Sequence, residues 1–177
     1  MNRLHLHVPS YDELWYRQRM LEDPATMSYN RGYDLAVAGY NRETGCIAFP
    51  ESIWREWYDR WIGLEPERFY AYLVRSSDGA FLGEVCLRRH ESGAWHEMGI
   101  VLEACRRGQG YAREGLALLL RHAFAHPGVQ AVHNTFEASR AAAAALHRQA
   151  GFAVLRNECG LLELCLTREA YSSSRDE

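Results

Sequence analysis

The stretch that decides the fold is Cys105–Gly115, "CRRGQGYAREG", which lies between two apolar segments. Residues 99–102, "GIVL", precede it and are typical of a buried strand. Residues 116–120, "LALLL", follow it and continue an apolar repeat with helical spacing. The sequence therefore predicts a strand that turns into a helix at two closely spaced glycines, Gly108 and Gly110.

A glycine-rich turn at the start of a helix predicts an anion-binding site. The helix dipole places about +0.5 of a charge there, and several backbone N–H groups are exposed. Glycines carry no Cβ that would keep a phosphate from the main chain. Arg106 and Arg107 can add charge-assisted hydrogen bonds. These features favour a pyrophosphate ligand, and the alternative is a solvated turn that binds nothing.

Two better-known phosphate loops do not fit this stretch. A P-loop ends in Gly-Lys-Ser/Thr, and the chain has no lysine at that place. The dinucleotide fingerprint needs a third glycine where this chain has Arg113.

The rest of the chain predicts a mixed α/β architecture. Apolar alternation, helical stripes and turn signals give the order β-α-α-β-β-β-α-β-α-β-β. The expected strands begin with Leu4-Leu6-Val8, and the others lie within 68–90 (two, joined at Asp78-Gly79), 94–103, 129–137, 152–158 and 161–167. The expected helices lie at 10–22, 50–63 and 139–151, and a long helix after the glycine-rich stretch is expected to carry Ala112, Leu116, Leu119, Leu120 and Ala123 on one face. We expect a short helical turn at 35–37 in the long stretch 23–49, and a frayed tail at 171–177.

Composition limits the class of protein. With 177 residues, we expect residues 1–177 to form a single domain. A net charge of −3 argues against nucleic acid and anionic lipid as partners. The N-terminus has no apolar signal core and no apolar run suggests a membrane span, so we expect a cytoplasmic protein.

We also expect no metal. The five cysteines show no paired spacing. His122 and His126 are one helical turn apart, but no obvious third ligand accompanies them in the sequence.

The sequence resembles the GNAT acyltransferase superfamily over almost its whole length. "RGQGYAREGLALLL" (107–120) is similar to that family's "RGxGYAxEAL" motif, which grips the pyrophosphate of acetyl-coenzyme A between a strand and a helix. A second match ends at Gly151-Phe152, where Ala143, Leu146 and His147 fit a helix motif of the family. Cys105 and Arg140 depart from the two motifs. The resemblance implies a GNAT-like fold, with a mostly antiparallel twisted sheet of about seven strands and helices on both faces.

The resemblance also implies an activity, the transfer of an acetyl group from acetyl-CoA to an amine by direct attack. The acceptor would be a primary amine of a small molecule or a protein, and the enzyme a monomer or homodimer. The alternative is a non-catalytic module that binds acyl-CoA. The implied coenzyme-binding residues are Ile100, Val101, Leu102, Arg107, Gly108, Gln109, Gly110, Tyr111, Ala112 and Arg140.

The resemblance further suggests residues for the chemistry. An amine with a pKa near 10.4 must lose a proton before it attacks, and Glu97 is the candidate base, directly or through a water. His147 stands where the family often has a tyrosine that protonates the departing thiolate. The alternatives are an exposed strand carboxylate and a helix-packing histidine bonded to a backbone carbonyl. Of the tyrosines at 29, 33 and 40 in the long loop region, which is expected to form an aromatic acceptor pocket, Tyr33 and Tyr40 are the candidate substrate-binding residues.

Overall fold

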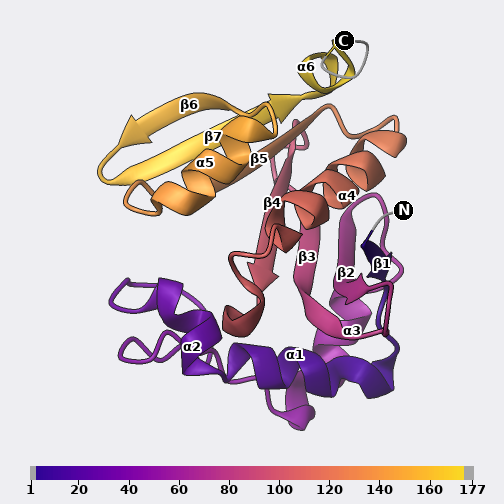
Figure 1. The fold of residues 1–177 in the computed structure, drawn as a ribbon, viewed down its shortest axis with the longest axis vertical. Helices are drawn as coiled ribbons and strands as arrows, with labels where there is room; N and C mark the ends of the chain where they lie inside the picture. Colours follow the sequence, from indigo (N-terminus) through magenta and orange to yellow (C-terminus); the bar gives the residue numbers. More distant parts are fainter. Residues whose placement is uncertain (1–2, 174–177) are drawn as a thin grey trace.

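A seven-stranded sheet forms the centre of the computed structural model, which describes residues 3–173 (Figure 1). The strands lie in the order β1-β2-β3-β4-β5-β7-β6. Every neighbouring pair is antiparallel except β4 and β5, which are parallel. The predicted mixed, mostly antiparallel sheet is therefore confirmed. The strands are β1 (Leu4–His7), β2 (Arg68–Arg75), β3 (Phe81–Arg89), β4 (His96–Leu102), β5 (Ala131–Glu137), β6 (Ala153–Glu158) and β7 (Leu161–Thr167).

Helices connect the strands in an order close to the predicted one. The α-helices are α1 (Leu14–Leu21), α2 (Pro24–Met27), α3 (Trp54–Trp61), α4 (Tyr111–Ala125), α5 (Ala141–Gln149) and α6 (Arg168–Ser173). Single 3-10 turns lie at Tyr11–Glu13, Ser28–Asn30, Glu51–Ile53 and Ala104–Arg106. No helix within residues 3–173 is both long and apolar enough to cross a bilayer.

Strand β2 shows why helices cover both faces of the sheet. Its alternate residues point to opposite faces, and nearly all of them are buried. Phe69, Ala71 and Leu73 join one core with Leu116 and Leu119 of α4. Tyr70, Tyr72 and Val74 join another with residues of α1 and α3, namely Tyr16, Met20, Trp57 and Trp61. The strand is thus apolar on both sides because two helical layers pack against it.

The parallel pair β4–β5 opens the sheet. Only two residue pairs are in register, His96 with Val132 and Glu97 with His133. Beyond them the two strands diverge (Figure 1). From Gly99 onward, β4 therefore forms no backbone ladder with the part of β5 that begins at Asn134, and a gap opens between the two strands.

The expected helical turn at 35–37 is wrong, because residues 34–37 form no helix. The long stretch instead turns at α2, where Asp23 caps the helix. The Asp23 carboxylate accepts hydrogen bonds from the backbone N–H groups of Ala25 (3.1 Å) and Thr26 (3.0 Å). Pro24 occupies the first helical position, where its missing N–H costs nothing. The Asp-Pro cap thus accounts for helix α2, which was not expected from the sequence.

The tail is also more ordered than expected up to Ser173. Helix α6 includes Tyr171, whose ring stacks on Phe124 with centroids 4.6 Å apart. The remaining tail, 174–177, lies outside the described residues.

Candidate functional site

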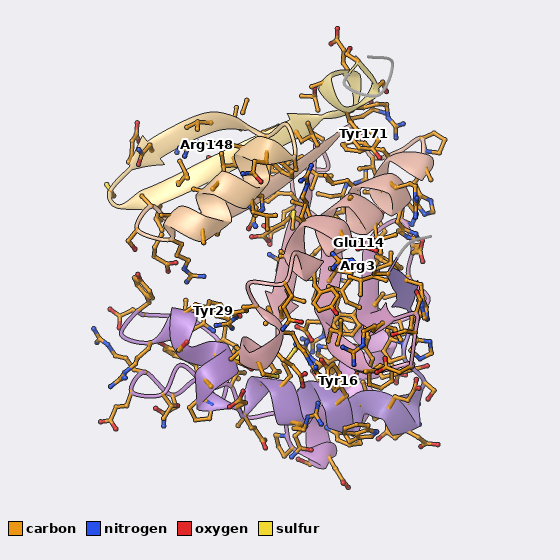
Figure 2. All side chains as sticks on the ribbon, viewed as in Figure 1. Arg3, Tyr16, Tyr29, Glu114, Arg148 and Tyr171 are labelled. Carbon is orange, nitrogen blue, oxygen red and sulfur yellow. The ribbon has the colours of Figure 1, made fainter. Side chains whose placement is uncertain are left out.

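The loop that enters α4 is fixed to the N-terminal part of the chain. The Arg107 guanidinium donates to the carbonyl oxygens of Thr26 (2.5 Å) and Leu102 (3.2 Å). The Ala104 N–H donates to the Thr26 hydroxyl (3.0 Å). In the first turn of α4, Glu114 accepts from Arg3 Nε (3.0 Å) and from the Leu4 N–H (2.8 Å), as Figure 2 helps to locate. These contacts hold the loop and the start of α4 against α2 and β1.

The two glycines give this loop its shape. Gly108 has φ +73° and Gly110 has φ +81°, both in the left-handed region that favours glycine. A Cβ added at Gly108 would meet nothing within 4 Å, so the main chain there faces open space. The N–H groups of residues 108–112 donate no hydrogen bond within the described part of the chain. They are free donors for a ligand, as at other helix N-termini.

A groove of about 600 Å³ begins at this loop and runs between the diverging strands. Its walls come from the ends of β4 and β5, the loop before α4, the inner face of α5 and the segment after α2. The lining residues are Tyr29, Gly99, Ile100, Val101, Leu102, Arg107, Gly108, Gly110, Ala112, Arg113, Asn134, Thr135, Phe136, Arg140, Ala142, Ala143, Ala145, Leu146, His147 and Gln149.

The groove is basic although the chain as a whole is acidic. Arg107, Arg113 and Arg140 line it, and no Asp or Glu is among its lining residues. The formal charge of the whole chain is −3. Arg106, also predicted to contact an anion, instead lies 3.6 Å from the Glu103 carboxylate and does not line the groove. Fixed positive charge beside free amides suits a diphosphate group.

Most of the predicted coenzyme-binding residues converge on this groove, but two do not line it. The Gln109 side chain folds back to donate to the Cys105 carbonyl (3.0 Å). The Tyr111 ring is buried in the core, and the Arg3 guanidinium lies 5.0 Å from its centroid. These two residues can serve a ligand only through their backbone N–H groups.

His147 lines the groove with both ring nitrogens occupied. Nδ1 lies 2.8 Å from the Ala143 carbonyl, which can only accept, so Nδ1 carries the proton. Nε2 lies 2.9 Å from the Asn134 side-chain amide and accepts from it. Burial lowers the pKa of His147 below its usual value. The ring is therefore neutral at pH 7, and its one proton is bonded to a backbone carbonyl.

Glu97 lies outside the groove. Its carboxylate forms an ion pair with Arg88 on the neighbouring strand β3. It is on the same face of β4 as Gly99, two residues away, which is about 7 Å along a strand. The structure thus brings His147 to the groove. Glu97 lies outside it, two residues along β4 from the lining residue Gly99.

A latch of aromatic and basic side chains spans the groove between the N-terminal segment and α5. The Arg140 guanidinium lies 4.8 Å from the Tyr29 ring centroid and 5.6 Å from that of Tyr33. The Tyr33 hydroxyl is 3.3 Å from Ser139 Oγ. Figure 2 shows Tyr29 on the side of the gap that faces α5. We call Tyr29, Tyr33, Ser139 and Arg140 the latch.

A second cavity of about 820 Å³ lies beside the latch and shares Thr135, Phe136 and Arg140 with the groove. Tyr33 lines it, together with the carboxylates of Asp34 and Glu137. Tyr40 does not line this cavity. Its hydroxyl donates to the carbonyls of Asn30 (2.5 Å) and Tyr33 (2.8 Å), so Tyr40 holds the loop that carries Tyr33.

Sequence reasoning gave no site role to Arg113 and Asn134, which both line the groove. Arg113 lies in the glycine-rich motif, one turn into α4, and its spacing from Gly110 was a usable signal. Asn134 carries no such signal, because only the divergence of β5 brings it to the groove. Tyr29, expected at the acceptor pocket from the sequence, lines the groove instead.

The expectation that His122 and His126 lack a third ligand is wrong. Glu65, from the loop between α3 and β2, accepts from both rings. A sequence separation of 57 residues from His122 hid this partner.

Comparisons with known proteins agree with the fold. A comparison with curated proteins finds no match. Among solved structures, a spermidine N-acetyltransferase from Vibrio cholerae in complex with CoA and spermine is similar, with a TM-score of 0.76, 14% identity and coverage of 97% of this chain and 99% of that one. A GNAT acetyltransferase from Bacillus anthracis has a TM-score of 0.70 and 12% identity, covering 94% of this chain and 96% of that one. The nucleotide-linked sugar GNAT FdhC also scores 0.70, at 16% identity, covering 99% of this chain and 92% of that one.

At these low sequence identities, the similar structures show only that the fold is shared. The family model, in contrast, matches the amino-acid sequence itself. The acetyltransferase (GNAT) domain model matches residues 3–153. This range includes the glycine loop, both diverging strands and α5. The chain therefore belongs to the GNAT acetyltransferase family.

Proposed function

We propose that the chain is an N-acetyltransferase that moves the acetyl group of acetyl-CoA to a primary amine by direct attack, and that residues 1–177 act as one domain. The observation that carries the proposal is the basic groove, in which free amides meet the guanidinium groups of Arg107 and Arg113, with Arg140 beside them in an ion pair with Glu137. The pyrophosphate would bind at Gly108–Ala112. The pantetheine arm would run between β4 and β5, where Ile100 and Val101 have backbone groups without a β5 partner.

The acceptor amine would enter through the second cavity. Asp34 and Glu137 line that cavity, where they pair with Arg42 and Arg140, and a cationic amine would bind by replacing one of these arginines. The Vibrio cholerae neighbour is a spermidine N-acetyltransferase with spermine bound, which is consistent with a cationic acceptor. FdhC is a nucleotide-linked sugar GNAT, so the fold alone does not choose between these classes.

The base and the proton donor are proposed from geometry. Glu97 would take the amine proton. It lies one side-chain repeat from Gly99 and its carboxylate is bonded to Arg88, so a water would carry the proton to it. His147 can donate to the thiolate only if its Nδ1 proton leaves the Ala143 carbonyl or Nε2 is protonated. Tyr29 is a second candidate donor, because burial raises the pKa of its phenol to about 12 and keeps it protonated.

The test is a thiol-release assay with acetyl-CoA and a panel of polyamines, amino sugars and peptides. We expect at least one amine to release CoA with saturation kinetics. Glu97→Gln should lower kcat at least tenfold, and the exposed turn variant Glu91→Gln is the control. His147→Phe and Tyr29→Phe identify the donor, with Tyr58→Phe, on α3, as the control. Unchanged kcat in the Glu97, His147 and Tyr29 variants would contradict all three roles.

The alternative is a non-catalytic module that binds acyl-CoA. It is favoured by one observation: the ring nitrogens of His147 and the carboxylate of Glu97 are all engaged within the protein. Calorimetric binding of acetyl-CoA without thiol release from any amine would support this alternative.

A further inference from the structure

We propose that Glu65, His122 and His126 form a binding site for a divalent transition-metal ion. The two histidines project from the C-terminal half of α4, and Glu65 comes from the loop before β2. One carboxylate oxygen, Oε2 of Glu65, lies 2.9 Å from His122 Nε2 and 2.8 Å from His126 Nε2. All three ligand atoms lie within 4.8 Å of one another, the one such group of three within residues 3–173.

The ligand types and spacing fit a tetrahedral ion. Two histidines at positions i and i+4 of a helix present their rings to one point, an arrangement that binds Zn²⁺ in proteins. Metal–ligand distances of about 2.0–2.2 Å place neighbouring ligand atoms roughly 3.3 Å apart in a tetrahedron. The observed nitrogen–oxygen separations are shorter by only a few tenths of an ångström. A small rotation of the Glu65 side chain is enough to admit the ion.

The rings are already held in a binding orientation. His122 stacks on Phe69, with ring centroids 3.7 Å apart. The backbone carbonyl of His126 accepts from Arg168 (2.5 Å), which fixes the chain at that residue. On binding, the proton that each Nε2 now donates to Glu65 would leave that nitrogen, and the neutral ring would carry a proton on Nδ1 while the Nε2 lone pair binds the ion.

The side chains leave the fourth coordination position open to solvent. Their exposed fractions are 28% for His122, 36% for His126 and 34% for Glu65. The ion would keep a water there, and the donor set of two imidazoles and one carboxylate favours Zn²⁺, Co²⁺, Ni²⁺ or Cu²⁺ over Mg²⁺.

The site is distinct from the coenzyme groove. None of its three residues lines the groove. His122 follows Tyr111 by eleven residues, roughly 16 Å along the axis of α4. A bound ion would therefore tie the loop before β2 to α4 and stabilise the fold without touching the acetyl group.

The test is a Co²⁺ titration of the protein made without a polyhistidine tag and kept reduced. We expect one equivalent to bind with the visible absorption of tetrahedral Co²⁺, and Zn²⁺ to displace it. Glu65→Gln and the double variant His122→Gln/His126→Gln should each weaken binding at least tenfold. His90→Gln changes an exposed histidine elsewhere and should leave the affinity unchanged.

Thermal unfolding gives a second readout. Zn²⁺ at about 100 times its Kd should raise the Tm by at least 5 °C in the wild type and in His90→Gln. It should not raise the Tm of the double variant. The unfolding temperatures without metal show whether each variant folds.

Three outcomes would overturn the proposal. One is the absence of saturable Co²⁺ binding in the wild type. Another is binding that survives in both Glu65→Gln and the double variant. The third is a near-ultraviolet thiolate–cobalt band, which would assign the metal to cysteines. None of these outcomes depends on acetyl transfer, so the proposal stands or fails separately from the proposed function.

Discussion

The backbone groups at the two ends of α4 differ in whether they have hydrogen-bond partners within the protein. At the N-terminus the amides of residues 108–112 have no acceptor in the described chain, and Gly110 offers no side chain as a cap. At the C-terminus one guanidinium, that of Arg168, donates to the carbonyls of Phe124 (2.8 Å), His126 (2.5 Å) and Val129 (2.8 and 3.0 Å). The chain closes one end with its own side chain and leaves the other open for a ligand.

This difference separates stability from binding. The closed end should matter to the free energy of unfolding, and the open end to coenzyme affinity. Changes at each end can therefore be compared along a single helix.

The largest effect is expected at the closed end. Arg168→Ala leaves three carbonyls without their charged donor and should lower the free energy of unfolding by about 2–4 kcal/mol. The affinity for acetyl-CoA should stay unchanged. Urea denaturation and calorimetry measure the two quantities. The control is Arg156→Ala, at an exposed arginine 3.9 Å from Glu163, which should cost little. Similar losses in both variants would contradict the role of Arg168.

At the open end, Gly108→Ala should mainly affect binding. Alanine at φ +73° is strained by about 1 kcal/mol, and relief of that strain would turn the amides away from the ligand. We expect at least a tenfold loss of acetyl-CoA affinity by calorimetry. Gly128→Ala is the matched control, because Gly128 follows the closed end and is not among the glycines with positive φ. Equal affinities in the two variants would show that the loop geometry is not needed.

Arg113→Ala tests the charge at the open end. Loss of one charge-assisted contact should weaken acetyl-CoA binding about tenfold and reduce its salt dependence. Arg121→Ala, two turns further along α4 and outside the groove, should bind as the wild type does. A greater loss in Arg121→Ala than in Arg113→Ala would place the phosphates elsewhere.

The smallest effect concerns pH. Burial lowers the pKa of His147, so below about pH 6.5 the unfolded chain binds a proton that the folded chain does not. The stabilisation is thus fully present above pH 6.5 and is lost as pH falls toward the folded-state pKa. We expect His147 to contribute about 1 kcal/mol to the loss of stability between pH 7.5 and 5.5.

Urea denaturation at both pH values measures this loss. It should be smaller in His147→Phe and unchanged in the exposed-site variant His5→Gln. An identical pH dependence in His147→Phe and the wild type would contradict the expectation.

Part of the site could be read from local patterns. The glycine loop, the helix that follows it and the strands on either side are encoded by neighbouring residues, because turn chemistry and apolar periodicity act over a few positions. The short helix at Pro24–Met27 was not expected because its Asp-Pro cap was not recognised. Whether Glu97 and His147 act in catalysis stays a prediction that their variants will test.

The sequence by itself determined the family, the order of the strands and of the four longer helices, and the glycine turn that starts α4, because each rests on residues close together in the chain. Only the tertiary structure decided which side chains face the groove. Arg113 reaches it while Arg106 pairs with Glu103, and Tyr29 meets Arg140 across 111 positions. It also brought Glu65 to two histidines on α4. These contacts depend on how the sheet opens and the helices pack, and no local pattern carries that information.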